Sequence, residues 1–200
     1  MTRVDLADFD NFYNNNLQSY LDTGIVQDKL ILVETITDPL IVCYHNDLDY
    51  NEKYVNDNHY VTVNLHHSGG CVVSFNGDYM IGYFSENSSD FFEYVLNEFV
   101  RRLPELLEGD HKIELNGNDI LIDGKKISGA MCTNFYNKIN FMGFFISYQS
   151  DIDIIKNICT KPMEKEPIGL SEFNVNHNSF EQLLLDIIRN FEVMEENIDA

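Results

Sequence analysis

Apolar residues recur at helical spacing in three stretches of the chain. From residue 5 to about residue 21 they lie three or four positions apart, which places them on one face of a helix. Residues 91–103 carry a wider apolar face, and residues 179–191 repeat the pattern near the C-terminal end of the sequence. A shorter helix is expected at 151–158. The spacing therefore predicts helices at both ends of the chain and in its middle.

Short apolar runs bounded by turn residues predict strands. The runs are rich in β-branched and aromatic residues, which favour extended backbone. Turn-forming pairs such as Asp38-Pro39 and Asn76-Gly77 lie between them. We predict strands at 30–33, 40–44, 61–65, 71–75, 80–84 and 141–148.

The segment 111–128 predicts two successive hairpins. Asn116-Gly117 and Asp123-Gly124 separate three short runs, at 111–115, 119–122 and 125–128. Both pairs tolerate the positive φ angles of a type I′ turn, which joins antiparallel strands tightly. We therefore predict a three-stranded meander in this segment.

The order of these elements predicts an α+β fold. Helices should flank a mostly antiparallel sheet, because several strands precede the central helix and a meander follows it. The sequence has no fixed-period repeat and no linker rich in Pro, Gly or Ser. At 200 residues, with 44% hydrophobic residues, it can bury one core. We expect a single domain over residues 1–200.

The charge balance limits the partners that this chain can have. Asp and Glu number 33 against 13 Lys and Arg, so the formal net charge at pH 7 is −20. The summed field repels phosphate backbones and anionic lipid headgroups. We therefore expect neither nucleic-acid binding nor membrane binding.

Apolar runs and cysteines indicate the compartment. No run approaches the ~18 residues that a membrane-spanning helix needs, and no secretory signal is apparent. The four cysteines include no Cys-x-x-Cys pair, so free thiols are expected rather than disulfides or a structural zinc site. These features favour a cytoplasmic protein.

Two local features of the sequence could each take part in ligand binding or catalysis. Ser68-Gly69-Gly70 lies between two predicted strands, where bare backbone can approach an anion closely or simply form a tight turn. Lys126 follows the Asp-Gly turn, where its ammonium can face a developing negative charge or stay in solvent. Neither feature alone identifies a site.

Together, three stretches resemble the lipoate-protein ligase family, in the superfamily that includes biotin ligases and octanoyltransferases. These stretches are His66-His67-Ser68-Gly69-Gly70-Cys71-Val72-Val73, Asn118-Asp119-Ile120 and Gly124-Lys125-Lys126-Ile127-Ser128-Gly129-Ala130. The resemblance implies the fold of the biotin/lipoate-protein ligase catalytic domain. It also implies that lipoate or octanoate attacks ATP, with Mg²⁺, to give an acyl-adenylate. The acyl group then passes to a lysine of a lipoyl domain or a glycine-cleavage H-type protein.

The resemblance also assigns roles to residues. Lys126 would be the catalytic lysine, and Asn118 and Asp119 would orient the adenylate, with Asp119 holding Mg²⁺. Val72, Val73 and Phe75 would line the acyl tunnel, although the same residues suit a hydrophobic core. The remaining adenylate-binding and acyl-binding positions would be His66, His67, Ser68, Gly69, Gly70, Cys71, Ser128, Gly129 and Ala130.

Departures from the family pattern leave two alternatives open. His66 and His67 stand where the family has two arginines, and Cys71 stands where a third glycine is usual. An ATP-independent octanoyl or lipoyl transferase is one alternative. In it, Cys159 would be the nucleophile that forms a thioester, and Lys126 would lower its pKa. Cys159 can also be interpreted as a buried, inert thiol. The other is a catalytically silent relative that binds lipoate or a partner. With about 40 residues after position 161, we expect no C-terminal accessory domain.

Overall fold

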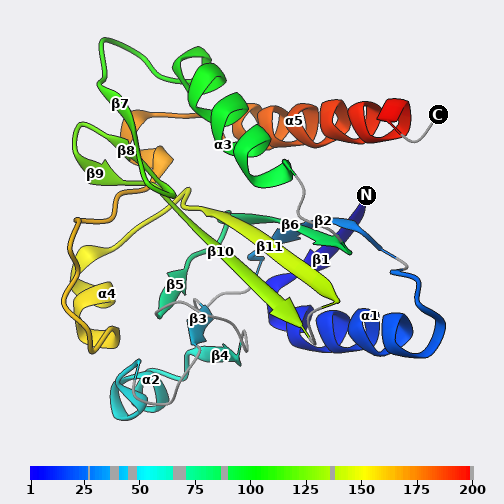
Figure 1. Cartoon of the computed structure of the whole chain (residues 1–200). Coiled ribbons are helices and arrows are strands. Elements are labelled where there is room, and N and C mark those ends of the chain that lie inside the picture. Colours follow the sequence, from blue (N-terminus) through cyan, green and yellow to red (C-terminus); the bar gives the residue numbers. More distant parts are fainter. Residues whose placement is uncertain are drawn as a thin grey trace.

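A five-stranded sheet forms the centre of the molecule in the computed structural model (Figure 1). The structure describes residues 1–26, 28–36, 41–44, 49–64, 71–86, 90–135 and 138–198. In spatial order the strands are β1 (Thr2–Asp5), β2 (Leu30–Glu34), β6 (Tyr79–Ser85), β11 (Ile139–Ile146) and β10 (Ser128–Phe135). All neighbours are antiparallel except β1 and β2, which pair in parallel.

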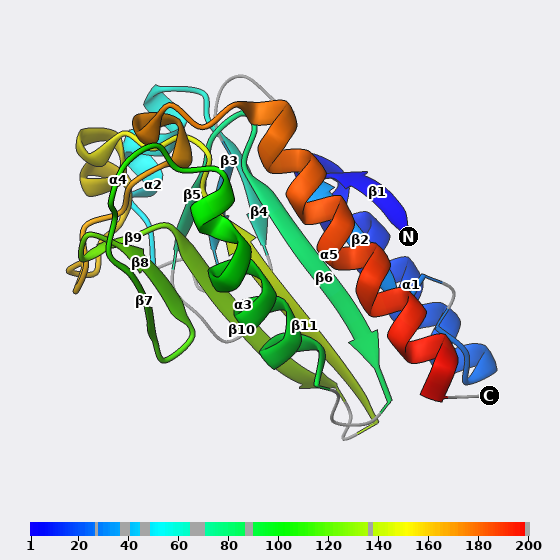
Figure 2. The same ribbon diagram turned by 90° about the horizontal axis from the view of Figure 1, so that it is seen from above.

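Helices cover both faces of this sheet (Figures 1 and 2). Helices α3 (Phe91–Arg102) and α5 (His177–Ile198) pack together on one face, and α1 (Phe9–Thr23) covers the other. The alternation of side chains along each strand produces two cores, because successive residues point to opposite faces. In β6, for example, Ile81 joins the core under α3 and α5, whereas Met80 joins the core under α1.

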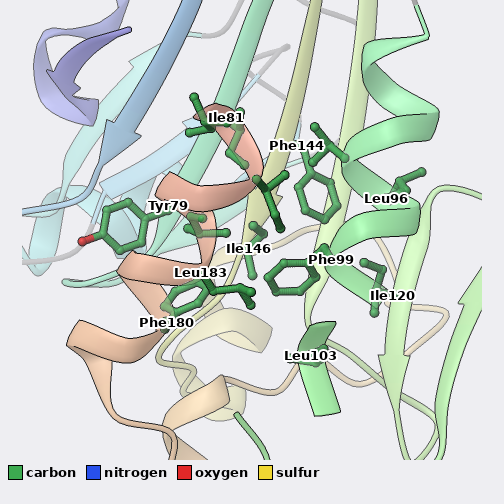
Figure 3. Close-up of a cluster of buried hydrophobic side chains, with 14 of the residues drawn as sticks. Tyr79, Ile81, Leu96, Phe99, Leu103, Ile120, Phe144, Ile146, Phe180 and Leu183 are labelled. Atoms are coloured by element: carbon green, nitrogen blue, oxygen red, sulfur yellow. The ribbon is translucent and has the colours of Figure 1, made fainter. Parts of the chain in front are cut away.

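Aromatic and aliphatic side chains fill the larger core (Figure 3). Phe99 from α3 meets Phe144 of β11 edge to face, with ring centroids 5.8 Å apart. Phe180 from α5 stands edge to face with Tyr79 of β6 at 5.6 Å. Burial of such rings contributes about 2–3 kcal/mol each relative to exposure, so this layer fixes the sheet that carries the site.

Two three-stranded sheets extend the structure at one end (Figure 2). One has the order β4-β3-β5 and the other the order β7-β8-β9. Their strands are β3 (Ile41–Tyr44), β4 (Val61–Asn64), β5 (Val72–Ser74), β7 (Ile113–Asn116), β8 (Asp119–Ile122) and β9 (Lys125–Lys126). The remaining elements are α2 (Glu52–Asp57), α4 (Ile152–Ile158) and the short 3₁₀ turns η1 (Leu6–Asp8), η2 (Leu103–Glu105) and η3 (Leu170–Phe173).

The predicted α+β architecture is confirmed. Each predicted helix is present, with α5 longer at both ends than the predicted 179–191. Each predicted strand overlaps an observed one, and the meander consists of β7, β8 and β9. Three elements were not predicted: β1, α2 and β10.

The two hairpins of the meander differ in their turns. Asp123 and Gly124 both have positive φ, at 51° and 80°, as a type I′ turn requires. In the first hairpin Asn116 pairs with Asp119, so the loop is Gly117-Asn118, and only Gly117 has a positive φ, at 62°. The prediction of a type I′ turn at Asn116-Gly117 is therefore wrong. The meander also ends earlier than predicted, because Ser128 already belongs to β10.

Several predicted features lie outside the described residues. These include the Gly-rich turn with both histidines, that is, His66, His67, Ser68, Gly69 and Gly70. Within the described ranges, no helix has the length and apolar character needed to cross a bilayer.

Candidate functional site

A cavity of about 550 Å³ opens where the two small sheets meet the end of the central sheet. Its walls come from β5, β8, β9, the start of β10, helix α4 and the segment 161–167. Segments far apart in the sequence thus converge on it. Its size falls within the range of small-molecule pockets.

Three charged side chains form one wall of the cavity. The Lys126 ammonium lies 2.9 Å from Asp119 Oδ1, and the Lys165 ammonium lies 2.9 Å from Asp119 Oδ2. The side chains are 38%, 23% and 21% exposed for Lys126, Asp119 and Lys165. Two ammonium groups against one carboxylate give this cluster a net positive charge, and Glu164 also lines the cavity.

The pKa of Asp119 reflects both lysines. Partial burial acts to raise this pKa, but hydrogen bonds from Lys126 and Lys165 outweigh burial and hold it below the ordinary value. Asp119 therefore stays ionised at neutral pH. It orients both ammonium groups toward the same space.

Two backbone hydrogen bonds attach Lys126 to the segment that follows α4. Its N–H donates to the Glu166 carbonyl at 2.8 Å, and its carbonyl accepts from the Ile168 N–H at 2.9 Å. Strand β9 has only two residues, so this parallel pairing supplies the support that a longer meander strand would give. The pairing also brings Lys165 to the site.

The start of β10 completes this wall. Ser128 is buried, and its hydroxyl oxygen accepts from the Ile120 N–H at 2.9 Å, which ties β8 to β10. A Cβ added at Gly129 would lie 3.6 Å from Lys126 Nζ, so the ammonium sits directly over this glycine. Larger side chains at Gly129 would occupy the space of the ammonium. Ala130 also lines the cavity.

Apolar side chains make up another part of the lining. They are Val72 and Val73 of β5, together with Met131, Phe145 and Ile155. An amphiphilic ligand with an anionic head and an aliphatic chain matches a lining that contains both this charged cluster and apolar side chains.

Two predicted residues are not among the described residues that line the cavity. Phe75 is half-buried and packs against the hydrophobic cluster of Val42 and Val55, so here the core interpretation describes its surroundings. Asn118 is exposed at the tip of the first hairpin. Neither belongs to the described lining of the cavity.

A pair of thiols lies in the wall formed by β5 and α4. Cys71 and Cys159 both line the cavity and are hydrogen-bonded to each other. This hydrogen bond raises the pKa of Cys71 and lowers that of Cys159. The expectation that Lys126 lowers the pKa of Cys159 is therefore wrong, since the neighbouring thiol does so. Cys159 is also only half-buried.

A further ion pair lies at the rim. The Lys161 ammonium contacts Asp49, whose side chain is only 3% exposed. Lys161, Lys165 and Asp49 line the cavity but were not among the site residues predicted from the sequence. The one available signal was the spacing of two lysines four residues apart after a predicted helix, and this signal does not indicate what they contact.

A resident magnesium ion does not fit the described donor set. The described residues contain no group of three or more side chains of the kinds that hold a metal. Both oxygens of Asp119 are already paired with ammonium groups. A cation there would have to displace a lysine, and no step below depends on one.

Comparison with known proteins shows which proteins share this fold. The chain has the same fold as solved structures of lipoate-protein ligases. No protein-family model matches the sequence.

The individual relatives make this similarity specific. Among curated proteins, a lipoate-protein ligase from Streptococcus pyogenes serotype M5 (strain Manfredo) is 26% identical over 159 residues, which covers 75% of this chain and 45% of the relative. The chain superimposes on P. falciparum LipL1 in complex with lipoate with a TM-score of 0.69 and 17% identity, covering 100% of this chain and 61% of that one.

Two further solved structures share the fold. The bipartite lipoate-protein ligase of Thermoplasma acidophilum, studied with its E2 lipoyl domain, gives a TM-score of 0.68 at 18% identity, covering 98% of this chain and 83% of that chain. Lipoate-protein ligase A bound with ATP gives 0.62 at 18% identity, covering 90% and 78%. The resemblance found in the sequence motifs is thus confirmed, while the chain spans less than half the length of its curated relative.

Proposed function

We propose that this chain activates lipoate, or a medium-chain acid such as octanoate, with ATP and transfers the acyl group to a protein lysine. The observation that carries the proposal is the Lys126-Asp119-Lys165 cluster in the lining of a cavity that apolar side chains also line. The names of the relatives support the choice of ligands, since they include complexes with lipoate and with ATP.

The geometry suits the first half of this reaction. The carboxylate oxygen of the acid attacks the α-phosphorus of ATP, the bond to the β-phosphate oxygen breaks, and pyrophosphate leaves. Negative charge grows on the oxygens around the α-phosphorus during this step. An ammonium fixed over Gly129 stabilises that charge without having to reorganise, because both its carboxylate partner and its backbone are already held.

The same group serves the second half. The unprotonated amine of the acceptor lysine attacks the acyl carbon, the bond to the phosphate oxygen breaks, and AMP leaves. Charge develops on the acyl oxygen and then on AMP, next to the same two lysines. A lipoyl domain is the acceptor that we propose, in keeping with the T. acidophilum ligase and its E2 lipoyl domain.

Pyrophosphate release with lipoate, ATP and Mg²⁺ in the buffer tests the proposal. Lys126→Ala should lower the rate by about 100-fold or more, as removal of a preorganised electrostatic group does. Lys125→Ala is a matched control, because the Lys125 ammonium contacts Glu166 at 2.6 Å and lies outside the described lining of the cavity. We expect the control to retain most of the activity.

Absence of pyrophosphate release would contradict the proposal. A folded wild-type chain that releases no pyrophosphate above background is not an adenylating enzyme. Saturable lipoate binding in that sample, without transfer to a lipoyl domain, would favour a silent relative.

A second candidate function rests on Cys159. Its lowered pKa and its place in the cavity wall suit a transferase that carries the acyl group as a thioester. The Cys159 thiolate would attack the thioester of an octanoyl carrier protein, expel the carrier thiolate and hold the octanoyl group. Octanoyl labelling of wild type that persists in Cys159→Ser would exclude this candidate.

A further inference from the structure

Two cysteines from distant parts of the chain meet in the wall of the cavity. Cys71 directly precedes β5, and Cys159 follows the last turn of α4. Their thiols are hydrogen-bonded to each other. Such contact between side chains 88 positions apart arises only from the tertiary fold.

The backbone around each thiol is anchored. Cys159 pairs with Tyr50 in an antiparallel bridge, and its N–H donates to the Ile155 carbonyl at 2.8 Å. On the other side, Val72 is in register with Cys43 of β3. Both thiols also pack against the same apolar cluster, which includes Val73 and Ile158. The two sulfur atoms are therefore neighbours by construction of the fold and not through loose loops.

The hydrogen bond shifts the pKa values of the two thiols in opposite directions. The hydrogen bond lowers the pKa of Cys159 and raises that of Cys71, which corresponds to a Cys71 thiol donating to a Cys159 thiolate. Thiolates are the attacking species in disulfide exchange, so Cys159 is suited to attack and Cys71 to resolve.

We propose that Cys71 and Cys159 form a site of reversible oxidation, at which a small organic disulfide entering the cavity converts the two thiols into an intramolecular disulfide. The Cys159 thiolate attacks one sulfur of the organic disulfide, whose S–S bond breaks and releases one thiolate. The Cys71 thiol then loses its proton to the released thiolate and attacks the Cys159 sulfur, which expels the second half of the organic disulfide. Two protein thiols are oxidised, and one disulfide is reduced to two thiols.

The other cysteines provide internal controls. Cys43 is fully buried, and burial raises its pKa to about 12, so it should stay reduced. Cys132 is exposed on β10, and partial burial of its thiol raises its pKa. It tests whether oxidation follows exposure or the geometry of the pair.

Peptide mapping tests the proposal. The reduced chain is treated with glutathione disulfide, the remaining thiols are alkylated, and the digest is analysed by mass spectrometry without reductant. We expect one cross-linked pair of peptides that contains Cys71 and Cys159 and disappears on treatment with dithiothreitol. Glutathione adducts on either cysteine without the cross-link, or no reaction at both, would overturn the proposal.

Variants separate the two steps. In Cys71→Ser the reaction should stop at a stable glutathione adduct on Cys159, whereas in Cys159→Ser modification of Cys71 should slow by about tenfold or more. Cys132→Ser should form the cross-link at the wild-type rate. Circular dichroism checks that each variant is folded, and the wild-type map decides the question if a variant is not. Oxidation needs no acyl-adenylate, so its outcome is independent of the pyrophosphate assay.

Discussion

Asp78 joins two segments of the protein, and its removal gives the sharpest test of how the site is supported. The side chain is fully buried. Its Oδ1 accepts from the N–H groups of Tyr148 and Gln149 at 2.6 and 3.0 Å, and its Oδ2 accepts from the Phe75 N–H at 2.9 Å. One carboxyl therefore connects the end of β5 to the segment after β11, in which Ser147 and Gln149 line the cavity.

The effect of Asp78→Ala follows from these contacts. These hydrogen bonds are partly buried, and each N–H left without an acceptor costs at most about 1–3 kcal/mol, so the three together cost at most roughly 3–9 kcal/mol. The alanine variant is also relieved of the desolvation penalty of a buried carboxylate, which amounts to several kcal/mol. We expect a net loss of about 3 kcal/mol in the free energy of unfolding. For a chain of this length that corresponds to a fall of roughly 6–12 °C in Tm.

Urea denaturation followed by circular dichroism measures this loss at pH 8, since the chain has no tryptophan to report by fluorescence. Asp57→Ala is the control, because Asp57 is 60% exposed and its ion-pair partner, Lys53, lies on the same helix. It should change stability by less than about 0.5 kcal/mol. A loss below about 1 kcal/mol in Asp78→Ala, with an unchanged m-value, would refute the idea that these hydrogen bonds hold the segments together.

Three further predictions concern the site and its support. Lys165→Ala removes the net positive charge of the cluster around Asp119 and should lower kcat/KM for pyrophosphate release by about tenfold or more. Lys165→Arg keeps the charge and should retain more activity, so equal losses in the two variants would count against a role for charge. Gly169→Ala places a Cβ 2.5 Å from the Tyr148 carbonyl oxygen, which is backbone, and should destabilise the fold by about 1–3 kcal/mol in a thermal melt, so an unchanged Tm would contradict the packing. Burial raises the pKa of Asp78 to about 7, so the folded state binds more protons than the unfolded state between about pH 4 and pH 7, and this carboxyl makes stability fall as pH rises through that window. The stability of wild type relative to Asp78→Asn should decline over the same window, and a difference that stays constant would show that Asp78 titrates normally.

The sequence predicted elements whose signal is local. The Asp123-Gly124 turn needs positive φ at both positions, and few residue pairs other than Asn-Gly and Asp-Gly accept it readily. Strand β10 was missed because it begins with Ser128, Gly129 and Ala130, which give no apolar alternation. It exists because β11 supplies an antiparallel partner along its whole length. Helix α2 is only six residues long and buries a single apolar residue, so it has no periodic signal.

The candidate site likewise contains some contacts that the sequence indicates and others that it does not. Asp119 and Lys126 lie on adjacent strands of one hairpin pair, so a motif in the sequence already brings them close together. Lys165 reaches Asp119 from 46 positions away, through pairing of its segment with β9. The contact between Cys71 and Cys159 likewise depends on how α4 packs against β5. Sequence patterns indicate which residues are reactive, but contacts of this kind require the folded chain.

The double attachment of Lys126 to residues 166–168 has a practical consequence for how the protein can be cut or rebuilt. A fragment that stops after α4 would retain the whole lysine motif yet lose the hydrogen-bond partners that fix its main chain. Minimal fragments, split reporters and circular permutants should therefore keep residues up to Ile168 on the same polypeptide as the hairpin of β8 and β9. Breakpoints at the exposed Gly117-Asn118 tip leave that attachment intact.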